Sequence, residues 1–362
     1  MHKLERSSRR SSPIRRGSGI AGPADPRRAG VVAVAAVGAL FLLASCVTLV
    51  SRDDLAAEYL EVANTLYESG AFDAARTYYG RALELNPDLE SASFNLARVH
   101  IEQERYERAI ALLEELRRER PDSLELAEAL AFALLKSGAL DRAEELYRQI
   151  LDESPYRTSV LFNLGVLARE LERPWDALDY LARAYEVAPD DADVAFAYAS
   201  LLAERGRPEA AVPVFETFID GADAEDERLK EVARIFEETE YYSRALSVYE
   251  RVLDADSEDA QAQFRRARLL LTVAEDVETG LSALEQALDL GYEDRGQLGL
   301  LVEDSALVAP ADVEELLRSE GFELPALREA AEQARQEEAE RRQAAASPRR
   351  RPGRPYRQAI TP

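Results

Sequence analysis

The sequence contains very few of the residues that most often perform catalysis or bind metals. Its 362 residues include one cysteine, one methionine, one tryptophan and two histidines. A single cysteine excludes an internal disulfide framework and a cluster of thiolate ligands. His2 lies near the start of the chain and His100 has no second histidine nearby, which leaves little for histidine-based acid–base chemistry or zinc binding. The sequence therefore predicts no cofactor, no metal site and no enzymatic activity.

Positive charge is scarce in the long central part of the chain. Residues 1–50 carry eight Lys or Arg against two acidic residues, and residues 347–362 carry five Arg and no acidic residue. Because the whole chain has a net charge of −24, residues 51–346 carry −35. A body with this charge repels phosphate backbones, so we expect no nucleic-acid partner.

The single cysteine ends a long apolar run. Arg27 and Arg28 precede the segment VVAVAAVGALFLLAS, which has the length of the apolar region of a secretory leader. The run closes on Leu43-Ala44-Ser45-Cys46. This motif resembles the lipobox of bacterial lipoprotein signal peptides, in which a lipid is joined to the cysteine sulfur and the chain is cleaved before it. The resemblance implies that Cys46 is acylated and attaches the chain to membrane lipid.

This interpretation divides the first part of the chain into residues 1–45, a basic leader and signal peptide, and residues 46–55, a short tether. It implies a lipid-anchored protein that faces the periplasm, and Val47 after the cysteine favours the outer membrane over the inner one. Two alternatives remain open. Residues 31–50 could span a bilayer as an uncleaved helix, or the leader could be an ordinary cleaved one.

A repeat of 34 residues organises the rest of the chain. Small residues recur at this spacing, at Ala63, Ala97, Ala131, Gly165, Ala199, Ala233 and Ala267. Twelve residues after each of the first six stands an alanine, and four residues further a large apolar residue: Ala75 and Tyr79, Ala109 and Leu113, Ala143 and Tyr147, Ala177 and Leu181, Ala211 and Phe215, Ala245 and Tyr249. Apolar residues follow helical spacing twice in each unit, so every unit is expected to form a helical hairpin.

The pattern resembles the tetratricopeptide (TPR) repeat, and the resemblance covers residues 56 to about 290. It implies an all-α fold, a right-handed TPR superhelix (α-solenoid) with C-terminal capping helices. One hairpin cannot bury its apolar face alone, so neighbouring hairpins must stack. We expect six repeats over residues 56–259.

The end of the chain departs from the repeat. In the seventh unit, Thr279 occupies the second alanine column and the pattern resumes one residue late at Gly280. Residues 260–322 are therefore predicted to form a degenerate seventh repeat followed by short capping helices. Residues 323–362 are predicted to form a charged helix that lacks an apolar stripe wide enough to dock, and then a basic, proline-rich, disordered tail. Pro213 is expected to kink the second helix of repeat five.

The TPR resemblance also implies where a partner binds, because in that family the first helix of each hairpin lines the concave groove. The groove residues expected on this basis are Leu60, Asn64, Phe94, Asn95, Arg98, Phe132, Phe162, Asn163, Phe196 and Phe264. Phenylalanines in one column would supply an apolar stripe for a partner's anchors, or would pack on the neighbouring hairpin. Asparagine side chains can hold a peptide backbone.

Two other kinds of site are disfavoured. A carboxylate clamp of the kind found in chaperone-binding TPR domains needs cations where this chain has Leu60, Glu125 and Ala129. His100 falls on an inward-facing column, which favours a packed core histidine over a catalytic one.

The sequence thus predicts a membrane-anchored interaction scaffold of the bacterial cell envelope that binds a protein partner through its groove. The alternative is a solute-handling accessory protein that binds an apolar ligand or a periplasmic solute receptor. A continuous phenylalanine-lined tunnel would favour the alternative, and an open cleft with mixed polar groups would favour the scaffold.

Overall fold

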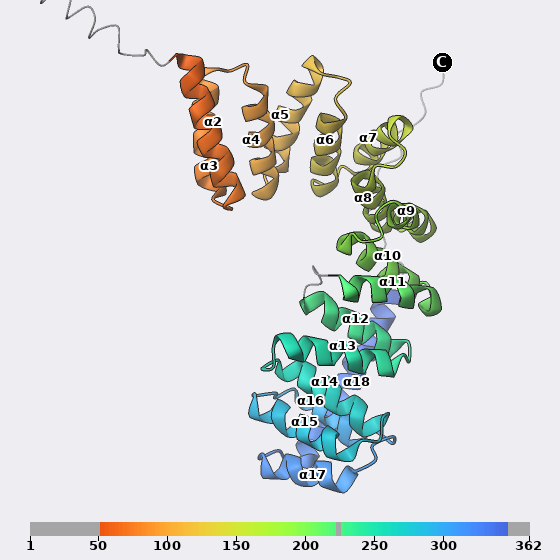
Figure 1. Ribbon diagram of the computed structural model, residues 1–362. Helices are drawn as coiled ribbons and strands as arrows, with labels where there is room; N and C mark the ends of the chain where they lie inside the picture. Colours follow the sequence, from red (N-terminus) through yellow and green to blue (C-terminus); the bar gives the residue numbers. More distant parts are fainter. Residues whose placement is uncertain (1–50, 222–225, 347–362) are drawn as a thin grey trace, which may run out of the picture. The chain divides into compact units, whose positions relative to one another are not determined.

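The computed structural model describes residues 51–221 and 226–346, and every regular element in these ranges is a helix (Figure 1). The all-α repeat fold expected from the sequence is therefore confirmed. The chain divides into two compact units, of which unit 1 ends at Gln103 and unit 2 begins at Glu104. The division falls in the turn between the two helices of repeat two. Each unit is described separately below.

Unit 1 contains three described helices, α2 (Arg52–Glu68), α3 (Phe72–Leu85) and α4 (Glu90–Glu102). Helix α2 begins four residues before the expected start of the first repeat. Ser51 caps it: the Ser51 hydroxyl accepts a hydrogen bond from the Asp54 amide, and the Asp54 carboxylate accepts one from the Ser51 amide. This reciprocal capping box satisfies amides that otherwise lack a partner, which fixes the start of the helix.

Unit 2 contains the second helix of repeat two, repeats three to seven, and three closing helices. The helices of the repeats are α5 (Tyr106–Glu119), α6 (Leu124–Lys136), α7 (Leu140–Glu153), α8 (Thr158–Glu170), α9 (Pro174–Val187), α10 (Ala192–Glu204), α11 (Pro208–Asp220), α12 (Asp226–Glu238), α13 (Tyr242–Ala255), α14 (Ala260–Thr272) and α15 (Val277–Asp289). Consecutive helices pair as hairpins, and the hairpins succeed one another along the unit (Figure 1). Pro213, the residue at which a kink is expected, lies inside α11, and the helix is not interrupted there.

The repeat columns form the core of both units. All seven small residues of the first column are buried, and so are the six alanines of the second column. The six large residues that follow them, from Tyr79 to Tyr249, are at most 2% exposed. Small side chains let the two helices of a hairpin approach, and the large side chains fill the space between hairpins. Gly165 shows how tight the approach is, because a Cβ there would lie 2.6 Å from the Leu181 side chain.

The turn between the two helices of a hairpin uses one left-handed residue per repeat. Positive φ angles recur every 34 residues, at Gly70, Glu104, Gly138, Glu172, Gly206 and Glu240. A non-glycine residue in this conformation suffers a clash between its Cβ and the backbone. Three repeats therefore carry local strain that the other three avoid with glycine.

We predict opposite effects for exchanges at two of these turns. Gly138→Ala introduces a Cβ at φ 80° and should lower the free energy of unfolding by about 1 kcal/mol. Glu172→Gly removes the strain at φ 56° and should raise that free energy by up to about 1 kcal/mol, less the entropy that glycine adds to the unfolded chain. Urea denaturation followed by circular dichroism measures both changes, and equal signs would contradict the explanation.

The seventh repeat closes with an insertion of one residue. Its left-handed residue is Glu275, which is 35 residues after Glu240, and the small residue of its second helix is Gly280. A Cβ at Gly280 would lie 2.7 Å from the Leu271 side chain, so Gly280 takes the part of the missing alanine. The expectation that the pattern resumes one residue late is confirmed.

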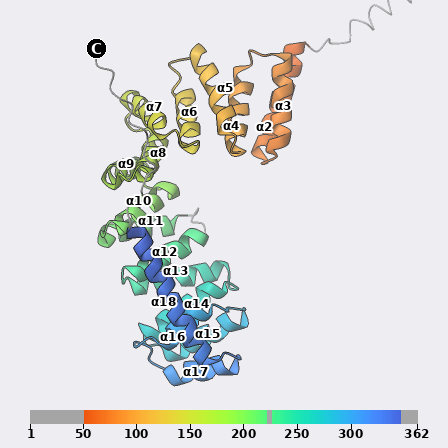
Figure 2. The same ribbon diagram turned by 180° about the vertical axis from the view of Figure 1, so that it is seen from behind.

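The closing helices are α16 (Arg295–Val302), α17 (Pro310–Ser319) and α18 (Leu324–Ala346). The first two lie at the end of residues 260–322, where short capping helices are predicted to follow the seventh repeat. Helix α18 is a correction to the sequence prediction, because its first half docks along α16 instead of standing in solvent (Figure 2).

The docked half of α18 buries a narrow apolar stripe. Leu324 is 7% exposed, Leu327 1% and Ala331 fully buried. The stripe suffices because Gly299 of α16 has no side chain to hold the helices apart. A Cβ on Gly299 would lie 2.0 Å from the Leu327 carbonyl oxygen.

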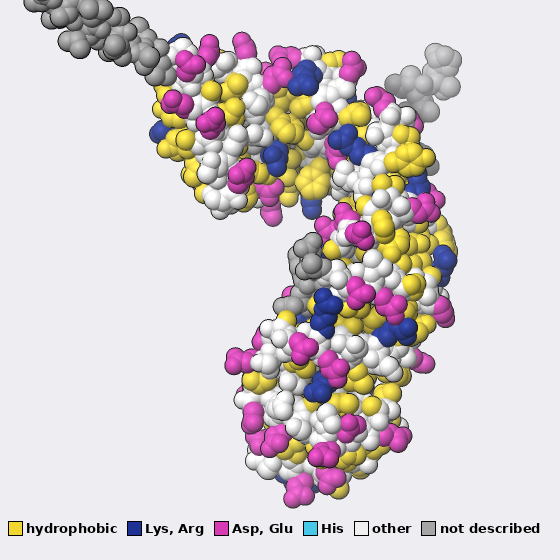
Figure 3. Space-filling view, viewed as in Figure 1, with side chains coloured by type: hydrophobic (Ala, Val, Ile, Leu, Met, Phe, Trp, Pro, Cys, Tyr) yellow, Lys and Arg dark blue, Asp and Glu magenta, His cyan; other side chains and the backbone are white. Residues whose placement is uncertain are grey.

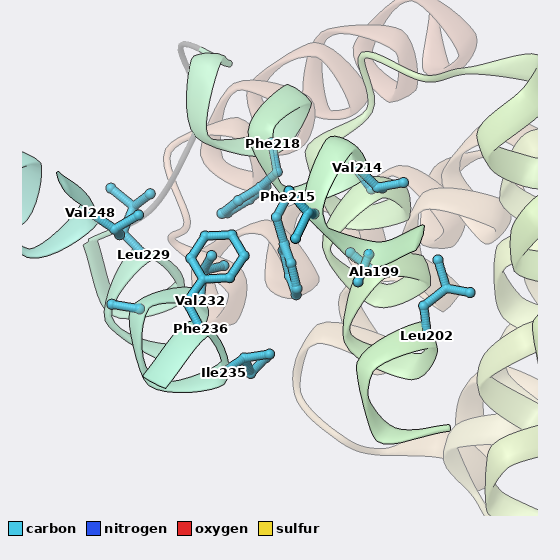
Figure 4. Packing of buried hydrophobic residues seen from close by; sticks show 14 of the residues in the cluster. Ala199, Leu202, Val214, Phe215, Phe218, Leu229, Val232, Ile235, Phe236 and Val248 are labelled. Carbon is cyan, nitrogen blue, oxygen red and sulfur yellow. The ribbon is translucent and has the colours of Figure 1, made fainter. Parts of the chain in front are cut away.

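The centre of unit 2 is rich in phenylalanine. Phe215 of α11 lies against Phe236 of α12, and Phe218, Leu229, Val232 and Val248 belong to the same buried cluster (Figure 4). The ring centroids of Phe215 and Phe236 are 5.6 Å apart with the rings nearly perpendicular. This edge-to-face contact adds to the burial of two large apolar side chains, so it should make α11 and α12 a stable part of the unit.

Candidate partner-binding surface

The expected groove residues lie on the first helices of the repeats, which are α2 and α4 in unit 1 and α6, α8, α10, α12 and α14 in unit 2. We call the side of these helices that faces away from the second helices the first-helix face. The two units are treated separately.

In unit 1 the first-helix face carries a network of amide groups. The Asn64 side-chain oxygen accepts a hydrogen bond from the Tyr79 hydroxyl at 2.7 Å and another from the Asn95 amide nitrogen at 2.9 Å. Asn64 and Asn95 come from α2 and α4, so the network joins the first helices of two successive repeats. Both side chains are partly exposed. The structure thus brings together two of the predicted groove residues.

An aromatic ring and a cation lie beside this network. The Arg98 guanidinium carbon lies 4.6 Å from the centre of the Tyr67 ring, and the Tyr67 hydroxyl lies 3.2 Å from a Glu102 carboxylate oxygen. Partial burial raises the pKa of the Tyr67 hydroxyl, although the charge of Arg98 opposes the shift. Leu60 and Phe94 are both partly buried, and Leu60 packs on the core of unit 1.

In unit 2 the predicted phenylalanines occupy three successive first helices. Phe132 on α6, Phe162 on α8 and Phe196 on α10 are each partly buried, as is Asn163. Phe162 and Phe196 pack on the core cluster of the unit. Phe196 also lies 5.4 Å from the Phe218 ring and has the Arg228 guanidinium 5.5 Å above its face. These side chains therefore combine a packing role with exposed ring surface.

Phe264 is a correction to the expected set. It is fully buried and stacks on Tyr292 at a centroid distance of 4.3 Å. Tyr292, three residues beyond the end of α15, supplies that second ring, and the closing helices complete the cluster around it. The Phe264 side chain therefore has no surface to offer a partner.

Sequence reasoning missed a series of ion pairs between successive first helices of unit 2. Arg157, which precedes α8, pairs with Glu128 of α6 at 2.6 Å, and Arg169 of α8 pairs with Glu204 of α10 at 3.2 Å. The series continues from α10 to α12 through Asp193 and Arg228 at 2.6 Å, and from α12 to α14 through Glu237 and Arg268. The two members of each pair are 29 to 35 residues apart in the sequence, which is close to one repeat length. A search for opposite charges at about this spacing could have found them.

Glu237 is the most buried member of this series, with 5% of its side chain exposed. Its carboxylate accepts a hydrogen bond from the Tyr249 hydroxyl at 2.5 Å, contacts Arg268, and lies 3.7 Å from Arg265. Burial lowers the pKa of the Arg268 guanidinium and raises that of Tyr249 to about 12. A buried carboxylate needs such partners, because desolvation of an unpaired charge is costly.

A charged cleft lies between the first-helix face of α12 and α14 and the exposed second half of α18. Its volume is about 920 Å³. Arg234, Glu237 and Glu238 line it from α12, and Arg265 and Arg268 from α14. The opposite wall is formed by α18, mainly by Gln333, Ala334, Glu337, Glu338 and Arg341. Figure 2 shows α18 lying over this part of unit 2.

The predicted lipid-attachment residue, Cys46, lies outside the described residues, as does the basic tail. Among residues 51–221 and 226–346, no helix has the length and apolar character needed to cross a bilayer. The same ranges contain no group of three or more His, Cys, Asp or Glu side chains placed to hold a metal ion. Acidic side chains are spread over the surface of unit 2 and interspersed with basic ones (Figure 3).

Two sequence models described as tetratricopeptide repeat match the chain. One matches residues 66–131, and the other matches residues 162–227 and 233–296. The matched ranges together cover more than half of the chain. They begin and end at other points than the 34-residue units defined above, but they lie within the same repeat region.

Two curated proteins share part of the sequence. Protein O-mannosyl-transferase Tmtc3 of Drosophila melanogaster is 32% identical over 132 residues, which are 36% of this chain and only 14% of that protein. A Treponema pallidum protein described as an uncharacterized lipoprotein is 27% identical over 143 residues, which are 40% of this chain and 73% of that protein.

Two solved structures resemble the fold at low identity. Pseudomonas aeruginosa PilF is 18% identical with a TM-score of 0.49, and the match covers 60% of this chain and 98% of PilF. A tetratricopeptide repeat protein from Parabacteroides merdae is 17% identical with a TM-score of 0.46, and the match covers 74% of this chain and all of that one.

Proposed function

Because the chain belongs to the tetratricopeptide repeat family, we propose that it is a protein–protein interaction scaffold that binds a partner segment on its first-helix face. We further propose that it is a lipoprotein of the bacterial cell envelope, attached to membrane lipid through Cys46 and facing the periplasm. The outer membrane is the proposed location, on the strength of Val47 after the cysteine.

One observation carries the binding proposal. Aromatic and amide side chains on successive first helices stay partly exposed, and Phe162 and Phe196 do so although they also pack on the core cluster of unit 2. In unit 1 the bonded pair Asn64 and Asn95 is partly exposed on this face. Such groups can donate to and accept from the backbone of an extended segment, and neighbouring rings offer apolar anchor sites.

Unit 2 favours the scaffold over the solute-handling alternative. A continuous tunnel lined by phenylalanine would favour binding of an apolar ligand, but Phe264 is fully buried in the core. The cleft beside α12 and α14 is lined by ten charged side chains. An open, polar surface suits a protein segment better than an apolar solute.

Substitutions on the first-helix face test the proposal. The variant Phe94→Ala/Phe132→Ala/Asn163→Ala removes two partly exposed rings and one amide while it leaves the repeat columns intact. We expect recovery of the partner from envelope extracts to fall roughly tenfold or more, because side chains of this kind each contribute about 1 kcal/mol at an interface. Quantitative mass spectrometry of material captured by the wild-type chain and the variant gives this ratio.

The matched control is Trp175→Ala. Trp175 belongs to α9, a second helix, and 67% of its surface is exposed, so its removal deletes an aromatic side chain outside the first-helix face. The control should capture the same proteins as the wild-type chain. Equal recovery by the triple variant would refute binding on the first-helix face.

Lipid attachment has a separate test. Cells that express the chain are labelled with radioactive palmitate, and we expect the label in the wild-type chain but not in Cys46→Ser. The Treponema pallidum relative, which is described as a lipoprotein, supports this part of the proposal. Label in the serine variant would contradict attachment at Cys46.

A short distance to the membrane follows from the proposal. Helix α2 begins at Arg52, so only four residues lie between Cys46 and the capping residue Ser51, which is five positions further along the chain. Five residue-to-residue steps span at most about 18 Å. The first repeat would therefore work close to the lipid surface.

A further inference from the structure

We propose that the charged cleft of unit 2 is a docking site for the chain's own basic C-terminal segment, residues 347–362. The cleft is the space between the first-helix face of α12 and α14 and the second half of α18. This proposal concerns the end of the chain and does not depend on the identity of an envelope partner.

The walls of the cleft hold more acidic than basic side chains. Six acidic residues line it, from α12, from α18 and from the ends of α16: Glu237, Glu238, Asp294, Asp304, Glu337 and Glu338. Four arginines line it, namely Arg234, Arg265, Arg268 and Arg341. The arginines already have carboxylate neighbours, since Arg234 pairs with Glu231 and Glu238 and Arg268 pairs with Glu237. An incoming cation would therefore meet an excess of negative charge.

The second half of α18 leaves the cleft open. Glu337 and Glu338 pair with Arg341 and Arg342 one turn further along the same helix, at 3.5 and 2.6 Å. Exposed pairs of this kind are weak, about 0.3–0.5 kcal/mol each, so another guanidinium can compete for these carboxylates. The cleft has room for such a group, with a volume of about 920 Å³.

The chain itself supplies the matching charge at the right place. The segment SPRRRPGRPYRQAITP contains five arginines and no acidic residue. It starts at Ser347, six residues after Arg341, the last cleft-lining residue of α18.

The segment is long enough to fold back along the cleft. Sixteen residues reach up to about 55 Å when extended. The cleft-lining part of α18, from Gln333 to Arg341, is only about 12 Å long. A covalent tether also raises the local concentration of the segment to the order of millimolar, so that even weak attraction would keep it in place. Docked there, it would cover the first-helix face of α12 and α14 and leave that of α6, α8 and α10 to a partner.

A peptide titration tests the proposal. The probe is a synthetic peptide of residues 347–362 with a fluorescent label at its N-terminus, and the protein is the chain ending at Ala346. We expect saturable binding by fluorescence anisotropy, with a Kd below about 1 mM and a strong dependence on salt. The variant Glu337→Gln/Glu338→Gln should weaken binding roughly fivefold, because two guanidinium–carboxylate contacts are lost.

The control removes the same charge from the same helix outside the cleft. Glu329 and Glu332 are exposed on α18 and do not line the cleft, so Glu329→Gln/Glu332→Gln should change the Kd less than twofold. Equal weakening by both pairs of substitutions would mean that the peptide responds only to the overall negative charge of the chain. This result would overturn the proposal. So would the absence of saturation up to about 1 mM. Dimers of the full chain that disappear on truncation at Ala346 would assign the segment to a second copy and also overturn it.

Discussion

Phe215→Ala should lower the free energy of unfolding by about 3–5 kcal/mol. Phe215 is fully buried on α11, and its ring lies against Phe236 of the next repeat (Figure 4). The substitution opens a cavity between two hairpins that depend on each other for burial. Because repeats of this kind are coupled mainly to their neighbours, α11 and α12 should lose protection first. Urea denaturation monitored by circular dichroism gives the total loss, and amide hydrogen exchange locates it.

The comparison variant is Phe132→Ala, which removes the same side chain from the first-helix face. Phe132 is partly exposed, so the loss should stay below about 1.5 kcal/mol. The two phenylalanines should also differ in function, with partner binding more sensitive to Phe132→Ala. Similar losses of stability in both variants would contradict the assignment of Phe215 to the core and Phe132 to the surface.

The repeat columns could be predicted because one geometric requirement recurs in every hairpin. A small residue must stand where two helices approach, and a large one must fill the gap to the next hairpin, so residues such as Ala177 and Leu181 keep a fixed spacing. The capping helices were also predictable, since the pattern stops while the last hairpin still needs a cover. The same register placed Asn64 and Asn95 on first helices, and the structure adds a hydrogen bond between them that the spacing alone did not predict.

Features that depend on contacts between distant segments were harder to predict. Phe264 stands in a groove column, but its burial results from Tyr292 and the closing helices, which follow no repeat register. Partners in the ion pairs between first helices, such as Glu237 and Arg268, look in sequence like ordinary charges on a solvated helix. The division after Gln103 leaves no trace in the spacing, because the 34-residue register continues through it.

Helix α18 shows why a narrow apolar stripe was misjudged. Counting apolar residues on one helix says nothing about how closely its neighbour can approach. Here α16 presents Gly299, so the backbones come close enough for Leu327 and Ala331 to be buried by a short helix. Two ion pairs reinforce the contact, Arg328 with Glu314 of α17 at 3.2 Å and Arg335 with Glu303 at 2.7 Å.

Gly299→Val should detach the first half of α18 from α16. Any Cβ at this position would lie 2.0 Å from a backbone carbonyl oxygen, which cannot move aside as a flexible side chain would. Detachment exposes Leu324 and Leu327, and burial of each is worth about 1.5–3 kcal/mol. We expect hydrogen-exchange protection of residues 324–334 to fall roughly hundredfold or more, while the protection of α6 to α11 stays unchanged.

The control for this prediction is Gly296→Ala on the same helix. A Cβ there would lie 3.2 Å from the Ala334 Cβ, a contact that a small shift relieves. The control should therefore keep most of the protection of α18. If Gly299→Val left that protection intact, α18 would have to be held by Arg328, Arg335 and their carboxylate partners instead of by close helix packing.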